Sequence, residues 1–174
     1  SNIGEAGGFI RLSGTIPELQ YHFHPLFFGN HGFNLPDEHG ISLVVNVTNP
    51  SSRGYLKIVA ADPKVPPYID ANLFSTKADM ETIIEGLKIG RKLMQTNALH
   101  KFVKNEYLPS EEVTTDQELE AFVRQYGTHI YHPVGTCRMG NDGVAVVNDQ
   151  LQVHHVQGLR IADASIMPSI VNAN

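Results

Sequence analysis

The feature that most constrains the fold of this chain is the order of its strand-like and helix-like segments. Runs rich in β-branched and aromatic residues come first, at 9–12, 19–24, 41–47 and 55–59. Two helical patterns follow, and the chain then returns to short strand-like runs, at 145–147, 151–153 and 159–162. The connections have hairpin length, whereas parallel strands need longer crossovers. This order predicts an α+β fold with an antiparallel sheet covered on one face by helices.

Two segments in the middle of the chain have helical periodicity. The first begins near Thr76, whose hydroxyl can cap a helix, and carries apolar residues at helical spacing over 80–94. The second opens with a capping box at 115–118 and ends at Gly127. We therefore expect two amphipathic helices, each with one face packed on the sheet.

Loop chemistry separates the expected strands. Glycine, proline and asparagine concentrate at 29–32, 35–40 and 49–54. Because the last of these loops is short, we expect the runs at 41–47 and 55–59 to pair as an antiparallel hairpin.

Composition excludes several classes of protein. With 174 residues and 41% apolar content, the chain can bury one core and an appended lobe. The net charge is -5, and no basic run could neutralise a phosphate backbone, so we expect no nucleic-acid partner. The longest apolar runs have the length of a strand, whereas a membrane span needs about 20 apolar residues. No membrane span is predicted.

The chain has a single cysteine, Cys137, which excludes an internal disulfide framework. One cysteine agrees with a reducing compartment, and the first residues lack the pattern of a signal peptide, so we expect a cytoplasmic protein. No CxxC or Cys/His pairing frames Cys137, and we interpret it as a small buried hydrophobic residue.

Nine histidines raise the question of a metal site. His22 and His24 are two residues apart on an expected strand, so their rings lie on one face. No carboxylate follows at a supporting spacing, and we favour a structural or cleft-lining role and predict no metal site. The adjacent His154 and His155 point to opposite faces if they lie on a strand.

His132 lies in a more constrained setting. It follows an aromatic residue and precedes Pro133 and Gly135, which force the backbone into a defined turn. An imidazole held in such a turn is suited to proton transfer near neutral pH. Asp163 follows the expected strand at 159–162, and either Asp163 or Ser165 can cap a turn or the start of a helix there.

Two C-terminal segments resemble the glucose-methanol-choline (GMC) family of FAD-dependent oxidoreductases, in its choline dehydrogenase-like branch. They are YHPVGTCRMG at 131–140 and the stretch from 147 to 174. Upstream, 5–9, 17–20, 49–54, 62–63 and 67–69 resemble the substrate-binding half of that family. The resemblance implies a substrate-binding domain at residues 1–128 and a catalytic segment at 129–174. This segment returns to a remnant of the FAD-binding domain.

The resemblance also implies roles for individual residues. His132 matches the catalytic histidine at the oxygen of a small alcohol substrate, a primary alcohol that is oxidised to an aldehyde by hydride transfer to FAD. Asn174 matches the second catalytic position and lies next to the flavin, with Asn172 as a competing assignment. Asp163 and the backbone of Ala164 match the segment that contacts FAD. The electron acceptor and the oligomeric state stay open.

The 174 residues contain no G-x-G-x-x-G pattern of the kind that binds a dinucleotide. We therefore expect a piece of a larger protein that binds little or no FAD alone and does not turn over alcohol. Two alternatives stay open: a noncatalytic binding module, and a histidine-rich, metal-dependent β-fold enzyme.

Overall fold

The computed structural model describes residues 4–28 and 36–172. Contacts between residues divide the chain into two compact units, of which the first joins Ser1–Ser51 to Phe74–Gly127. The second joins Ser52–Leu73 to Thr128–Asn174. Residues 52–73 thus pack with the C-terminal segment, and the predicted functional boundary between residues 128 and 129 stays a prediction.

The first unit contains a three-stranded antiparallel sheet. Its strands are β1 (Ala6–Ile10), β2 (Leu19–His24) and β3 (Ser42–Val47), in the order β1-β2-β3. The registers pair Gly8 with Tyr21 and Tyr21 with Val45. The expected strand at 9–12 begins and ends earlier than predicted, and the other two agree to within one residue.

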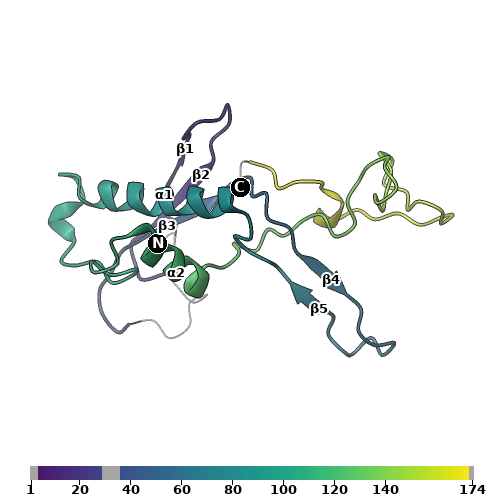
Figure 1. Ribbon diagram of the computed structural model, residues 1–174, viewed down its shortest axis with the longest axis horizontal. Helices are drawn as coiled ribbons and strands as arrows, with labels where there is room; N and C mark the ends of the chain where they lie inside the picture. The colour runs from purple at the N-terminus through teal and green to yellow at the C-terminus, as the bar shows by residue number, and fades with distance from the viewer. Residues whose placement is uncertain (1–3, 29–35, 173–174) are drawn as a thin grey trace. The chain divides into compact units, whose positions relative to one another are not determined.

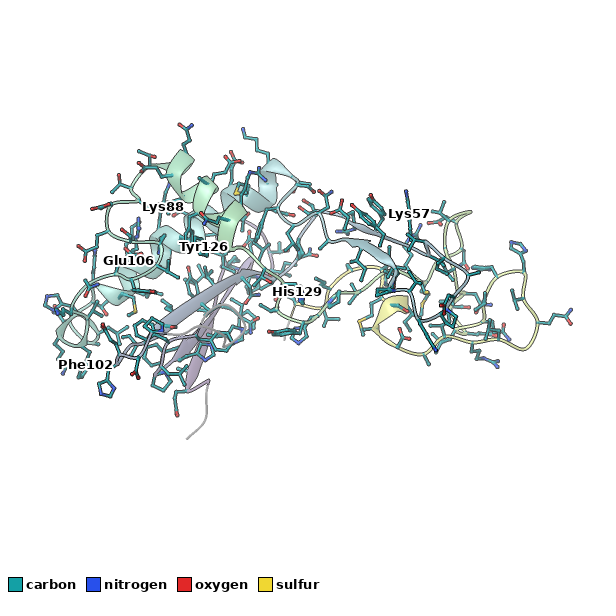
Figure 2. All side chains as sticks on the ribbon, turned by 90° about the horizontal axis from the view of Figure 1, so that it is seen from below. Lys57, Lys88, Phe102, Glu106, Tyr126 and His129 are labelled. Atoms are coloured by element: carbon teal, nitrogen blue, oxygen red, sulfur yellow. The ribbon has the colours of Figure 1, made fainter. Side chains whose placement is uncertain are left out.

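Both predicted helices are present, with the caps that the sequence predicts. In α1 (Lys77–Met94), the hydroxyl of Thr76 accepts a hydrogen bond from the main-chain N–H of Asp79. In α2 (Asp116–Tyr126), Thr115 and Glu118 form both bonds of the capping box, and Gly127 is the C-cap. Figure 1 shows α1 lying across the sheet, and in Figure 2 both helices lie on the same side of the strands.

The core of this unit lies between the two helices and one face of the sheet. Its buried residues are Met80, Ile83, Ile84, Leu119 and Val123, and the partly buried Val45 and Val47 of β3 pack against them. The α+β prediction, with helices on one face of an antiparallel sheet, is confirmed.

Helix α1 approaches the sheet most closely at Gly86. The Tyr21 hydroxyl, on the central strand, donates a hydrogen bond of 2.7 Å to the Gly86 carbonyl, and burial raises the pKa of Tyr21 to about 12. A Cβ on Gly86 would lie 2.9 Å from Val45 Cγ2 and 3.0 Å from Leu19 Cδ2. Only glycine therefore lets the helix sit at this distance.

A single arginine fastens the connection between the helices to α1. The connection includes the short 3-10 helix η2 (His100–Phe102). Arg91 Nε donates to both carboxylate oxygens of Glu106 at 3.0 Å, and its two terminal nitrogens donate to the carbonyls of Val113 and Ser110, at 2.7 and 2.9 Å. Figure 2 labels Glu106 beside α1.

The expected hairpin between 41–47 and 55–59 is wrong. Strand β4 (Tyr55–Lys57) pairs with β5 (Tyr68–Asp70), in a separate two-stranded antiparallel ribbon of the second unit. The N–H and the hydroxyl of Ser51 both bond to Asp79 Oδ1 at 2.9 Å. These bonds hold the connection at the start of α1, so the chain leaves the sheet before it can fold back on β3.

The rest of the second unit is built from turns around one buried side chain. Val147 has no exposed surface, and it forms a parallel bridge to Met139 and an antiparallel bridge to Val153. Gln152 bridges to Arg160. The strands expected at 145–147, 151–153 and 159–162 are thus reduced to single bridges.

Left-handed backbone flanks the middle one of these expected strands. Leu151, the first residue of the run at 151–153, has φ +64°, and His155, two residues beyond it, has φ +62°, so neither residue is extended. No helix in the described parts of the chain combines the length and the apolar character that a bilayer span requires.

Two glycine-to-alanine substitutions in α1, at Gly86 and Gly90, test the close approach of the helix to the sheet. Gly86→Ala places a methyl group against the stiff side chain of Val45, and we expect a net loss of about 1–2 kcal/mol in the free energy of unfolding. At Gly90 a Cβ would meet Tyr21 Cε1 at 3.5 Å, which is ordinary contact. Gly90→Ala is therefore expected to stabilise by up to about 1 kcal/mol, through helix propensity. Urea unfolding of both variants measures the difference, and equal effects would contradict the close approach.

The buried valine generates a second pair. Val147→Ala removes two methyl groups from a side chain without exposed surface, so we expect a loss of about 1–3 kcal/mol in the second unit. Val144→Ala, at an exposed position three residues away, is the control and should cost less than about 0.5 kcal/mol. Hydrogen exchange of the Met139 amide reports the local loss, which should appear in Val147→Ala alone.

Candidate active site

The candidate catalytic histidine lies in a strained turn of the second unit. His132 is exposed and follows Tyr131, whose φ of +67° is rare for a non-glycine residue. The Tyr131 N–H donates to His129 Nδ1 at 3.0 Å, and the two rings meet edge to face at 5.3 Å. Figure 2 labels His129 at the start of this segment. The main chain around His132 is therefore held by local contacts, as the Pro/Gly pattern predicts.

Two main-chain hydrogen bonds connect the His132 segment to the Asp163 turn. The Cys137 N–H donates to the Ser165 carbonyl at 3.0 Å, and the Met139 N–H donates to the Ile166 carbonyl at 2.7 Å. We call these two bonds, between 137–139 and 165–166, the ladder. Gly135 lies between His132 and the ladder, and its φ of +93° requires glycine. The structure thus brings together two segments that the sequence places more than twenty residues apart.

Further main-chain bonds connect residues 138–140 of the ladder segment to residues 146–147. The Gly140 N–H donates to the Val147 carbonyl at 3.0 Å, and the Val146 N–H donates to the Arg138 carbonyl at 3.0 Å. His154 contacts the Gly140 carbonyl through Nε2 at 2.9 Å, while its neighbour His155 is exposed. His154 therefore has a structural role, because its ring contacts the main chain of the segment at 138–140.

Asp163 caps the 3-10 helix η3 (Ala164–Ile166). Its Oδ1 accepts a hydrogen bond of 2.8 Å from the Ser165 N–H. Hydrogen bonds from the Ser165 hydroxyl and N–H lower the pKa of Asp163, so the carboxylate is ionised at neutral pH. The capping interpretation is confirmed. The exposed carboxylate is also a strong acceptor for hydroxyl groups, and contact with FAD stays a prediction, as it does for Ala164.

The remaining predicted site residue, Asn174, lies outside the described residues, so the pairing of His132 with Asn174 stays a prediction. Its competitor Asn172 is half-buried. Cys137 is a half-buried free thiol, less covered than we expected.

Arg138 forms an ion pair with Asp142, four residues along the chain. One of its terminal nitrogens contacts both carboxylate oxygens of Asp142 at 2.8 Å. The Arg138 guanidinium, together with the N–H of Val144, lowers the pKa of Asp142. This pair closes the turn at 138–145 and gives Arg138 a structural partner.

In the first unit, His22 and His24 share one face of β2, as predicted, and it is the face opposite Tyr21. Their rings stack with centroids 6.3 Å apart, and the ring of the buried His24 stacks on Phe28 at 4.5 Å. Within residues 4–28 and 36–172, no three side chains of His, Cys, Asp or Glu gather as a metal site would require.

The ladder between 137–139 and 165–166 and the strand β5 had no clear sequence signal. β5 spans three residues, which is too short to display alternation. The ladder is made by main-chain groups, and these are the same for every residue type. The one local signal was the glycine at 135, which marks a special backbone conformation without naming its partner.

Comparison with known proteins gives the family of the chain. The family model described as GMC oxidoreductase matches residues 50–174. The "Alcohol dehydrogenase [acceptor]" of Pseudomonas putida and the "Oxygen-dependent choline dehydrogenase" of Citrobacter koseri are each 41% identical to the chain. Both alignments include 100% of this chain and 32% of the relative. The chain thus spans about a third of the length of these curated relatives.

Two solved structures of oxidases have folds similar to that of this chain. Pyridoxine 4-oxidase from Mesorbium loti has a TM-score of 0.88 and 27% identity, over 98% of this chain and 34% of that chain. A formate oxidase of Aspergillus oryzae has a TM-score of 0.83 and 29% identity, over 90% and 28%. The matched residues include the His132 segment and the Asp163 turn, and the chain belongs to the GMC oxidoreductase family.

Proposed function

We propose that this chain is the substrate-binding and catalytic part of an FAD-dependent oxidoreductase that oxidises a primary alcohol to an aldehyde. The observation that carries the proposal is the ladder that holds the His132 segment against the Asp163 turn. The names of the relatives, an alcohol dehydrogenase and choline dehydrogenases, support the substrate class. The formate oxidase, whose title names FAD, supports the cofactor.

In this proposal His132 acts on the alcohol oxygen. An alcohol loses a proton from oxygen when it becomes an aldehyde, and an imidazole within hydrogen-bond reach can accept that proton. The side chain of His132 is exposed in the structure, and its backbone is fixed by the turn at Tyr131 and Gly135. A fixed backbone reduces the number of orientations that must be frozen when the substrate binds.

Asn174 supplies the second contact to the same oxygen in this proposal. A side-chain amide donates a hydrogen bond without titrating, so it stabilises negative charge on oxygen at every pH at which the protein is folded. Asn174 also lies beside the flavin in this assignment.

Bound FAD supplies the acceptor for the hydride that leaves the carbon. Asp163 and the backbone of Ala164 are the proposed contacts to it. The fit is chemical: Asp163 is exposed at the surface of the second unit, and its lowered pKa keeps it an ionised acceptor for hydroxyl groups such as those of a ribityl chain.

We further propose that the activity belongs to a larger protein, in which residues 1–128 bind substrate and residues 129–174 carry the catalytic groups. The chain spans about a third of its relatives, and it contains no G-x-G-x-x-G pattern for a dinucleotide. The 174 residues alone are expected to bind little FAD and to leave alcohol unchanged.

The decisive variant is His132→Ala in the complete protein encoded by the gene. Loss of the proton acceptor should lower kcat by about 10²–10⁴-fold. The measurement is the rate at which an alcohol bleaches the flavin absorbance without oxygen, across a panel of primary alcohols.

The matched control is His155→Asn, at another exposed histidine of the same unit. Asparagine tolerates the left-handed backbone at this position, so the variant should fold and keep the activity of the unsubstituted protein. If His132→Ala bleaches as fast as the control, the chain is a binding module and the proposed role of His132 is wrong.

A further inference from the structure

The two faces of the β4–β5 ribbon differ sharply in chemistry. The antiparallel register pairs Tyr55 with Asp70, Leu56 with Ile69, and Lys57 with Tyr68. Because facing residues point to the same side, the two tyrosines, Lys57 and Asp70 share one face. Leu56 and Ile69 share the other. Figure 1 shows β4 and β5 as two neighbouring strands, and Figure 2 labels Lys57 on this ribbon.

On the polar face, Tyr55, Tyr68 and Lys57 contact one another. The rings of Tyr55 and Tyr68 stack at 5.7 Å, and Lys57 Nζ lies 4.8 Å from the centre of the Tyr55 ring. The side-chain hydrogen bond between Tyr55 and Tyr68 raises the pKa of Tyr55. This face therefore needs no partner and is suited to water.

The opposite face is apolar and is not covered by the described residues of the second unit. Leu56 is 46% exposed, Ile69 is 65% exposed, and Ile58, two residues beyond Leu56, is 86% exposed. Covering a leucine or isoleucine side chain completely is worth about 1.5–3 kcal/mol. Two such side chains on one side of a narrow ribbon, with Ile58 next to the end of β4, are a strong reason for that side to be covered.

The surface that covers the apolar face of the ribbon must stay bound to it permanently. A two-stranded ribbon has marginal stability in water and needs packing on one face to stay folded. A transient partner would leave the ribbon without that packing for much of the time. A surface of the same protein provides it always, and the relatives that match this chain are about three times as long.

We propose that the face formed by Leu56, Ile58 and Ile69 is a docking surface for the flavin-binding part of the complete protein. The identity of that part rests on the proposed function. The residues lie within the stretch that the family model matches, and no catalytic residue is among them. The ribbon thus acts as a fastening between this chain and the part that holds the cofactor.

The test is thiol labelling of single cysteines placed on the two faces in the complete protein. Ile58→Cys and Ile69→Cys report the apolar face, and Lys57→Cys reports the polar face of the same ribbon. We expect maleimide to label positions 58 and 69 at least tenfold more slowly than position 57. Peptide mapping assigns each label and separates it from the native Cys137.

The concentration of protein distinguishes the possible covers. Slow labelling of 58 and 69 that does not change on dilution supports docking within one polypeptide. Protection that disappears on dilution assigns the face to a second copy of the protein, and equal rates on the two faces leave it open to solvent. Either result overturns the proposal.

Hydroxyl-radical footprinting of the unsubstituted protein provides a check that needs no cysteine. Ile58 and Ile69 should be protected in the folded protein relative to the urea-unfolded protein, whereas Val144, which is exposed, should not. Neither measurement depends on turnover. A protein that oxidises no alcohol but shields Ile58 would contradict the proposed function and keep the docking surface.

Discussion

The candidate site depends on two hydrogen bonds between main-chain groups, from Cys137 to Ser165 and from Met139 to Ile166. Every residue except proline carries the donor, and every residue carries the acceptor, so the ladder survives most changes of side chain. Behind it, the buried Val147 bridges to Met139 and fixes the strand that donates. The connection between the segment that follows His132 and the turn at Asp163 is thus made by the backbone.

The helices and the three-stranded sheet could be predicted because their signals are local. The cap at Thr76, the capping box at Thr115 and the end at Gly127 each involve residues a few positions apart. The pairing of β4 failed for the opposite reason. A short loop favours a hairpin, but the bonds from Ser51 to Asp79 span 28 positions and send the chain elsewhere. No local pattern announces such a contact.

The site was predictable in part. His132 and Asp163 were identified through a family resemblance, and the cap formed by Asp163 also follows from its own short sequence. The pairing of residues 137–139 with residues 165–166 could not be derived, because it is made by main-chain groups distant in sequence. The strand expected at 151–153 is limited by left-handed backbone at Leu151 and at His155, and leucine is a residue type that seldom adopts this backbone.

Arg91 holds the segment between α1 and α2 mainly through main-chain groups, which do not depend on the sequence of that segment. Two of its three partners are carbonyl groups, which any residue at positions 110 and 113 provides, and only Glu106 contributes a side chain. The bonds from Arg91 to positions 110 and 113 therefore do not depend on the side chains there, so substitutions at exposed positions of the segment between the helices can alter its surface while these bonds hold its path. A framework of this kind lets related proteins diversify a surface without refolding it.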